Sequence, residues 1–306
     1  MRIGVSLRSS FSTRPREGAR WMVERARASR DAGLDSLFVG DHHSTGPGAY
    51  YQNVPMMGRL LAEWDDRPAG ALFLLPLWHP VTVAEQIGTL AALAPGRFVM
   101  QTAIGGGATQ FGAMGVAMKG RAARFEAGLD AVRRLLAGEE VSDPDGRSGA
   151  PFGGARIAPV PAEPVEVWIG GTASPAIDRA ARLGDAWLAN ADVVPDEAGA
   201  QADVYRESCA HHGRTPTAVA IRRDVHVGAD PGAAAAVAEP VIASGYRGFR
   251  PEAFAWGSPE QVAEQFRALA AQGYTDVIVR QMAPEQRDAL ESIALLAEVK
   301  ALVADA

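Results

Sequence analysis

Short apolar runs alternate with longer segments of helical periodicity along the whole chain. An apolar run without polar alternation is typical of a strand covered on both faces, and apolar residues recurring every three or four positions are typical of an amphipathic helix. The pattern predicts strands at residues 2–7, 36–40, 69–77, 97–105, 165–171, 185–190, 218–228 and 275–282. It predicts helices at 16–32, 54–64, 80–94, 121–136, 174–184, 196–212 and 284–303, and another that begins at Ser258, its N-cap.

This alternation predicts an α/β fold, a single (β/α)8 TIM barrel of residues 1–306 with insertions in the loops. Two segments are expected as excursions from the barrel: the polar, Gly- and Pro-rich residues 138–163, and residues 229–257. An open doubly wound sheet usually has a glycine-rich turn after an early strand, but LRSSFSTRP, which ends the first strand and follows it, contains no glycine. The barrel is therefore favoured over the open sheet.

Composition narrows the classes of partner. The net charge of −6 comes without a basic stripe, so neither nucleic acid nor an anionic membrane is expected as a partner. The single cysteine, Cys209, excludes an internal disulfide. The N-terminal residues lack the pattern of a signal peptide, and the longest apolar run, AGALFLLPLW, is about half of the roughly 20 residues that a membrane helix needs. We expect a cytoplasmic protein.

In a (β/α)8 barrel the active site lies at the C-terminal ends of the strands. The sequence VGDHHSTG places Asp41, His42 and His43 at the end of the second predicted strand. An imidazole there is suited to acid/base chemistry, to hydrogen bonding of the loop, or to metal binding. The sequence offers no third ligand at a suitable spacing, so no metal site is predicted.

Several segments together resemble the bacterial luciferase-like flavin and deazaflavin oxidoreductases over most of the chain. They are GDHH, LPLWHPVTVAEQIGTLAALAPGRF, FGAMGV with RFEAGLDAVRRLL, PVEVWIGGTASPAIDRAARLGDAWL and GSPEQVAEQFRALAAQGYTDVIV. The resemblance implies a barrel that holds a reduced flavin or a deazaflavin at its C-terminal end. It also implies a homodimer.

The resemblance assigns the histidines different roles. In the luciferase pattern the first histidine of the pair faces the reacting flavin, and this position is His42 here. Because an unperturbed imidazole has a pKa of about 6.5, we expect His42 to act as the catalytic acid/base. His43 is expected to hydrogen-bond the backbone of the adjacent loop.

The turn WIGGTASPA combines two glycines, a hydroxyl residue and the start of a helix. Such a turn favours a bound phosphate, and the resemblance implies that Gly170, Gly171 and Thr172 hold the cofactor phosphate. The alternative is a strand-to-helix turn in which Thr172 or Ser174 caps the helix. Arg280 is a candidate counter-charge for the phosphate, or else an outward-facing arginine in a salt bridge.

The resemblance also implies contacts on the third and fourth strands. A non-proline cis peptide behind the flavin ring is expected near Ala71 and Leu72. Gln101 and Ala103 share one face of the fourth strand beside the ring, and Ala103 stands where luciferase has a reactive cysteine.

The chain also departs from the family pattern at two positions. Ile104 replaces an arginine that meets the phosphate in luciferase, and Ala108 replaces a catalytic glutamate of the deazaflavin-dependent sugar-phosphate dehydrogenases. The function predicted is a reduced-FMN-dependent monooxygenase, with FMN supplied by a separate flavin reductase, that inserts oxygen from O2 into a small organic substrate. The alternatives are a hydride-transfer enzyme using the 8-hydroxy-5-deazaflavin coenzyme, and a non-catalytic flavin-binding barrel.

The organic substrate is expected to meet variable loops at residues 10–15, 44–55 and 229–257. Their aromatic side chains favour an apolar or aromatic guest, or else a dimer interface. These aromatic residues are Tyr50, Tyr51, Tyr246, Phe249, Phe254 and Trp256.

Overall fold

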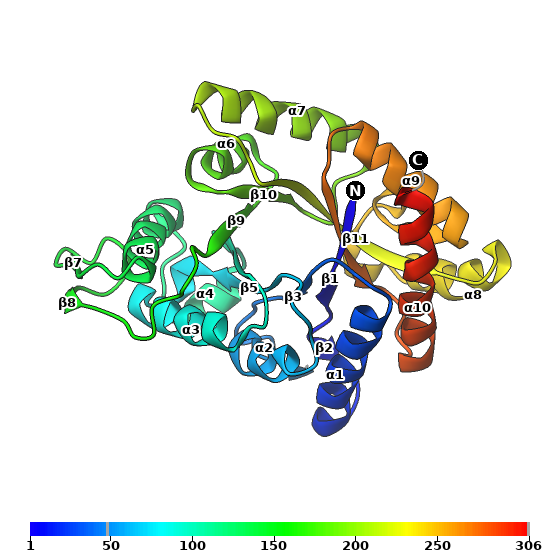
Figure 1. Cartoon of the computed structure of the whole chain (residues 1–306), viewed down its shortest axis with the longest axis horizontal. Helices are drawn as coiled ribbons and strands as arrows, with labels where there is room; N and C mark the ends of the chain where they lie inside the picture. The colour runs from blue at the N-terminus through cyan, green and yellow to red at the C-terminus, as the bar shows by residue number, and fades with distance from the viewer. Residues whose placement is uncertain (47–48, 305–306) are drawn as a thin grey trace. The chain divides into compact units, whose positions relative to one another are not determined.

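The computed structural model describes residues 1–46 and 49–304. Parallel strands alternate with helices from the N-terminus to the C-terminus (Figure 1). The strands in this alternation are β1 (Arg2–Leu7), β3 (Leu37–Val39), β5 (Ala69–Leu74), β6 (Phe98–Ala103), β9 (Glu166–Gly170), β10 (Ala186–Ala189), β11 (Ala218–Val227) and β13 (Asp276–Gln281). Each predicted strand is recovered, and the fold is the predicted α/β class, a (β/α)8 barrel.

The predicted helices are also recovered, with ends shifted by a few residues. They are α1 (Pro15–Asp31), α2 (Asn53–Leu61), α3 (Pro80–Leu93), α5 (Arg121–Leu136), α6 (Ser174–Leu183), α7 (Pro195–His211), α9 (Pro259–Ala271) and α10 (Gln286–Ala304). The strand predicted at 69–77 ends early, because residues 75–77 form the 3-10 helix η1 (Leu75–Leu77). Pro76 has no N–H to donate to a neighbouring strand, which accounts for this end.

By its contacts the chain divides into two compact units. The first unit comprises residues 1–8, 16–38 and 168–306, and the second comprises residues 9–15 and 39–167. In the first unit β9 pairs with β10, β10 with β11, β11 with β13 and β13 with β1, all in parallel. In the second unit β5 pairs in parallel with β6. The expectation of one domain over the whole chain stays a prediction.

The first unit is built around an aromatic core that also fixes a turn of the candidate site. Trp187 on β10 packs against Tyr205 and Tyr274, with ring centroids 5.2 and 6.0 Å away. Its indole N–H donates to the carbonyl oxygen of Gly171, 2.6 Å away, so the core holds the turn after β9. Cys209 on α7 is 3% exposed beside Tyr205, and burial raises the pKa of its thiol.

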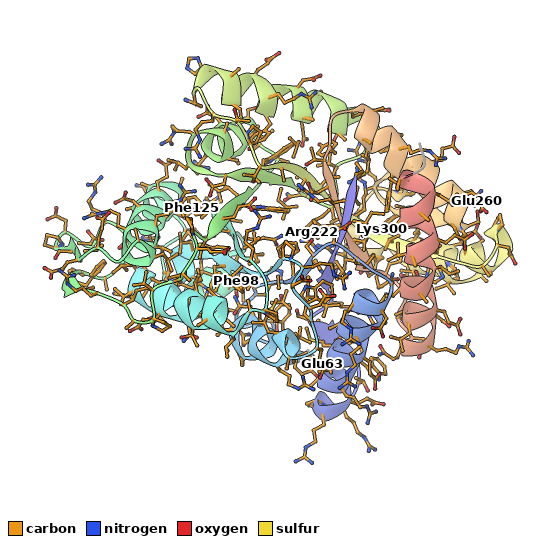
Figure 2. All side chains as sticks on the ribbon, in the orientation of Figure 1. Glu63, Phe98, Phe125, Arg222, Glu260 and Lys300 are labelled. Atoms are coloured by element: carbon orange, nitrogen blue, oxygen red, sulfur yellow. The ribbon has the colours of Figure 1, made fainter. Side chains whose placement is uncertain are left out.

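The end of α1 is tied to α10. Gly33, with φ +71°, follows α1 in the left-handed conformation that glycine adopts without strain, as the sequence predicts for a helix end. Lys300 on α10, labelled in Figure 2, donates to the carbonyl oxygen of Gly33 and to the carboxylate of Asp35, each at 2.5 Å. Among the described residues, no helix combines the length and apolar character needed to cross a membrane.

Both segments expected as excursions contain regular structure. Within 138–163, β7 (Val141–Asp143) and β8 (Phe152–Ala155) pair as an antiparallel sheet of their own. Within 229–257, α8 (Pro231–Ala243) is a helix that the periodicity did not reveal. Its run of alanines has no polar contrast, yet alanine has the highest helix propensity.

Other short elements were not predicted. The helix α4 (Ala108–Ala113) is too short to show a periodicity. The strands β2 (Ser10–Phe11) and β4 (Ala49–Tyr50) pair in an antiparallel ribbon, and β12 (Ala255–Gly257) adds to β11.

The start of α9 confirms the predicted cap. The Ser258 side chain accepts from the N–H of Gln261 at 3.5 Å, and the Gln261 side chain accepts from the Ser258 N–H at 3.0 Å. Pro259 occupies the first turn, where its missing N–H costs no helical hydrogen bond. This reciprocal pair is a capping box.

Replacing this cap tests its contribution to stability. We expect Ser258→Ala to lower the free energy of unfolding by about 1 kcal/mol, because the helix loses one satisfied N–H. The measurement is urea-induced unfolding followed by circular dichroism. Ser174→Ala is the control, because Ser174 is exposed at the start of α6 and makes no capping bond there. Equal losses in the two variants would contradict the assignment.

Candidate active site

The predicted site residues fall into two groups, one in each unit. The second unit carries His42, Leu72, Gln101 and Ala103 near the ends of β3, β5 and β6. The first unit carries the Gly170–Thr172 turn after β9 and Arg280 near the end of β13.

The carboxylate of Asp41 is the centre of the first group. It is 1% exposed, and its Oδ2 accepts from the backbone N–H of Leu74 and from the indole N–H of Trp78, both at 2.8 Å. Its Oδ1 lies 3.2 Å from Nε2 of His43, a contact that lacks hydrogen-bond geometry. Asp41 therefore fixes the turn after β3 to the end of β5.

The two histidines occupy different environments. His43 has an 11% exposed side chain, contacts Trp78 edge to face, and donates its backbone N–H to Oε1 of Gln110 at 2.8 Å. His42 is exposed, and its ring lies 5.4 Å from that of Tyr50. The structure thus fixes His43 within the protein and leaves His42 accessible to a ligand, as the assignment of the acid/base role to His42 requires.

One face of the β5–β6 pair gathers three predicted residues. Leu72 is opposite Gln101 and Leu74 is opposite Ala103, and register partners in a parallel pair point to the same side. Leu72 and Ala103 pack in one apolar cluster with Leu74 and Phe111. Gln101 is 4% exposed, and its Nε2 has no hydrogen-bond partner. This face offers an apolar surface with one amide donor.

The expected cis peptide near Ala71 and Leu72 is wrong. The cis bond recorded among the described residues is Ala158–Pro159. Ala71 and Leu72 instead continue the regular register with β6. A trans peptide allows this register, and a non-proline cis bond would cost roughly 3–4 kcal/mol. Ala71 has no exposed surface, and the carbonyl oxygen of Leu72 accepts from Asn53 at 2.7 Å. Only the Leu72 side chain of this pair is accessible to a ligand.

The turn after β9 has the features expected of an anion cradle. Gly171 has φ +151°, and a Cβ there would lie 2.7 Å from the Cβ of Ala176, so the start of α6 approaches closely only because this residue is glycine. The N-cap of α6 is Ala173, without a side-chain capping bond. The alternative in which Thr172 or Ser174 caps the helix is therefore wrong.

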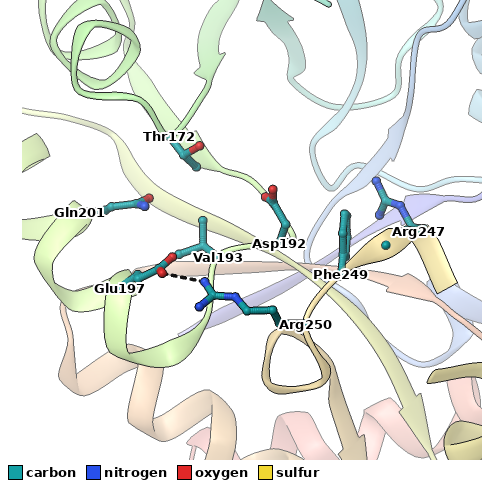
Figure 3. Close-up of a pocket in the computed structure, with 9 residues that line it drawn as sticks. Thr172, Asp192, Val193, Glu197, Gln201, Arg247, Phe249 and Arg250 are labelled. Carbon is teal, nitrogen blue, oxygen red and sulfur yellow. Dashed lines mark hydrogen bonds and ion pairs between the residues drawn. The ribbon is translucent and has the colours of Figure 1, made fainter. Parts of the chain in front are cut away.

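Thr172 opens onto a cavity of about 390 Å³ in the first unit (Figure 3). Asp192, Gln201 and Phe249 also line it, and Arg250 and Glu197 form an ion pair with 2.6 Å between Nη2 and Oε1 across it. Arg280 is not among its lining residues.

Arg280 lies in a different environment, which the sequence analysis missed. It is half-buried, and its Nε is buried without a hydrogen-bond partner, so the alternative of a surface salt bridge does not hold for it. Its register partner on β11 is the fully buried Asp224, whose Oδ2 accepts from Arg247 at 2.7 Å. Charged residues in the otherwise apolar run of β11 were the signal that could have revealed this cluster.

The aromatic residues expected at a substrate pocket have mixed outcomes. Tyr246, Phe249 and Trp256 pack around the buried Phe254 in one apolar cluster, and Tyr51 donates its hydroxyl to the carbonyl oxygen of Pro15. The expected substrate loop at 44–55 is described only in part, because Pro47 and Gly48 lie outside the described residues. In the described ranges, no cluster of three His, Cys, Asp or Glu side chains is arranged to hold a metal ion.

Comparison with known proteins identifies the family. A sequence model of the luciferase-like monooxygenase family matches residues 1–253. The chain belongs to this family. Its members are flavin- or deazaflavin-dependent oxidoreductases, so the resemblance found in the sequence is confirmed.

Two relatives matched by sequence are named for the same activity. An F420-dependent glucose-6-phosphate dehydrogenase from Nakamurella multipartita is 27% identical over 191 residues, 57% of this chain and 53% of the relative. Its counterpart from Beutenbergia cavernae is 32% identical over 176 residues, 52% of this chain and 49% of the relative. The match thus spans about half the length of these relatives.

Solved structures match nearly the whole chain. Monooxygenase RslO1 from Streptomyces bottropensis superposes with a TM-score of 0.83 at 18% identity, covering 97% of this chain and 98% of its own. An F420-dependent secondary alcohol dehydrogenase in complex with an F420–acetone adduct superposes with a TM-score of 0.80 at 17% identity, covering 99% and 98%. At such identities the likeness shows the fold alone.

Two glycine substitutions test whether the cradle requires glycine at position 171. We expect Gly171→Ala to lower the free energy of unfolding by roughly 1–3 kcal/mol, because the new Cβ clashes with Ala176 in a backbone conformation that alanine adopts poorly. Gly106→Ala is the matched control, because no atom lies within 4 Å of its added Cβ. Chemical unfolding of both variants measures the difference, and an unperturbed Gly171→Ala protein would contradict the close approach.

Proposed function

We propose that this protein is an F420-dependent oxidoreductase that transfers a hydride between a hydroxylated substrate and the deazaflavin. The observation that carries the choice of cofactor is that three relatives matched by sequence are named as F420-dependent dehydrogenases. This favours the deazaflavin alternative of the sequence analysis over the reduced-FMN monooxygenase. The structural matches include both kinds of enzyme and do not discriminate between them.

The residues present fit such a cofactor. Within the described residues, the backbone N–H groups of Thr172, Ala173 and Ser174 make no hydrogen bond, and the glycine turn leaves them open to a phosphate. Gln101 adds a buried amide donor without a partner beside the apolar face of Leu72 and Ala103. Each group taken by itself fits a part of such a cofactor: the turn after β9 suits a phosphate, and the Leu72 and Ala103 face with Gln101 suits a flat apolar ring with polar edges.

His42 supplies the proton chemistry of the proposal. When bound, the deazaflavin would supply the acceptor for the hydride on the carbon that carries the substrate hydroxyl. His42, as the base, takes the hydroxyl proton, so the alcohol loses two electrons and two protons in all and becomes a carbonyl compound. Asp41 and Gln110 hold the neighbouring His43, and the carbonyl oxygen of His42 accepts from Gln52 at 3.1 Å.

Glucose 6-phosphate is not the substrate we propose. Ala108, the first residue of α4, stands where the sugar-phosphate dehydrogenases carry a catalytic glutamate, and its methyl group has no proton to exchange. The substrate of this chain therefore depends on a different set of polar groups.

The homodimer expected from the resemblance stays part of the proposal.

Parallel titrations decide the cofactor. We expect F420 to bind with measurable affinity in absorbance and fluorescence titrations, and FMN to bind at least about tenfold more weakly, a difference of about 1.4 kcal/mol. Oxidised and reduced forms of both are titrated under anaerobic conditions. Selective binding of reduced FMN would favour the monooxygenase hypothesis instead. If neither cofactor binds in any form, the enzyme assignment is wrong.

Replacing His42 tests its catalytic role. We expect His42→Ala to lower kcat by about 10²-fold or more while F420 affinity stays within about twofold, because the residue moves a proton and does not hold the phosphate. His211→Ala is the control, an exposed histidine at the end of α7. Full turnover by His42→Ala with any substrate that the wild type oxidises would contradict the assignment.

A further inference from the structure

The cluster around Arg280 is built from strand ends of the first unit that are distant in sequence. Arg280 is the fifth of six residues in β13, and Arg8 directly follows β1, the strand paired with β13. Asp224 on β11 is the register partner of Arg280 on the other side of β13. The C-terminal ends of these strands are the functional end of a (β/α)8 barrel.

The guanidinium groups of this cluster act on one another. Burial lowers the pKa of the Arg8 guanidinium, and the cationic Arg280 and Arg247 lower it further. Burial likewise lowers the pKa of Arg25 to about 10, and the positive charges of Arg8 and Arg280 add to the effect. Like charges crowded in a poorly solvated place raise the electrostatic potential there and favour an anion.

The acid nearest to Arg280 in the strand register is already engaged. Asp224 is fully buried, and its Oδ2 accepts from Arg247 at 2.7 Å. Arg247 has φ +56°, a left-handed conformation that is unusual for a residue other than glycine, and its guanidinium also lies 4.4 Å from the Phe249 ring. Arg247 is thus fixed on Asp224, whereas the half-buried Arg280 forms no salt bridge within the described residues and has a buried, unpartnered Nε.

Tyr246 completes the set of donors. Burial raises the pKa of its hydroxyl, and the charge of Asp224 raises it further, so the phenol stays protonated at neutral pH. A guanidinium fork with an adjacent phenolic O–H matches the oxygens of a carboxylate or phosphate.

We propose that Arg280, supported by Arg8 and Tyr246, binds the anionic group of the substrate, a carboxylate or a phosphate. This inference rests on the proposed function, and it narrows the substrate to an alcohol that also carries such a group. It replaces the sequence-based assignment of Arg280 to the cofactor phosphate.

The position of Arg280 on β13 separates its side chain from the phosphate cradle after β9. β10 and β11 lie between β9 and β13 in the series of pairs, so the two sites are three strand spacings of about 4.8 Å apart along the sheet. The cavity that Thr172 lines includes Arg247 of this cluster but not Arg280. One anion at the turn after β9 and another at Arg280 therefore occupy different sites.

Thermal unfolding with inorganic phosphate as the probe tests the anion site. Phosphate is added at constant ionic strength, balanced with sodium chloride, to the wild type and to Arg280→Gln. We expect phosphate to raise the wild-type Tm by about 2–4 °C more than chloride does, and to raise the Tm of Arg280→Gln clearly less, because only the turn after β9 remains to bind it. Arg287→Gln, at a side chain 83% exposed on α10, is the matched control and should respond as the wild type does.

Equal responses of the wild type and Arg280→Gln, or no response of the wild type, would overturn the site. If Arg280→Gln fails to fold, Arg280→Lys keeps the charge and removes the bidentate fork, and its response to phosphate should fall below that of the wild type. An undiminished response in that variant would overturn the role of Arg280.

Titration with F420 shows whether Arg280 binds the phosphate of the cofactor or the anionic group of the substrate. We expect Arg280→Gln to bind F420 within about twofold of the wild type, because the cofactor phosphate lies at the other site. A loss of about tenfold or more would assign Arg280 to the cofactor and overturn the substrate role. Failure of the wild type itself to bind F420 would remove the proposed function, and the phosphate response alone would then decide whether the anion site exists.

Discussion

The buried carboxylate of Asp41 is the interaction on which the histidine part of the site depends. Burying a carboxylate with 1% exposure is costly without hydrogen bonds, and the Leu74 N–H and the Trp78 indole both donate to its Oδ2. Both donors become available because the strand ends at Leu74 and η1 turns Trp78 back towards it. The turn that carries His42 thus derives its position from a strand end two elements away.

Polar atoms without partners mark the rest of the site. Buried polar groups in folded proteins are nearly always hydrogen-bonded, so an exception requires an explanation. The Nε2 of Gln101 and the Nε of Arg280 are such exceptions, and both lie near the C-terminal ends of parallel strands. Only the Oδ2 of Asp41 is satisfied by the protein itself, whereas the two donors match the acceptor atoms of a ligand.

Sequence patterns predicted the barrel because its strands are apolar and its helices have one apolar stripe. They failed at α8, where alanine occupies both faces and removes the contrast. They located His42 through its motif. They could not predict the hydrogen bond from Trp78 to Asp41, because it depends on the path of the backbone through η1. The arginine cluster escaped because Arg8 and Arg280 lie at opposite ends of the chain and are brought together only by the pairing of β1 with β13.

The buried thiol on α7 has a practical consequence. Cys209 is the single cysteine of the chain, it is 3% exposed, and burial raises the pKa of its thiol, so little reactive thiolate exists at neutral pH. A cysteine introduced on an exposed position would therefore react with a maleimide far faster than the native one. The natural sequence already serves as a background for attaching a single fluorophore or spin label without first removing a native thiol.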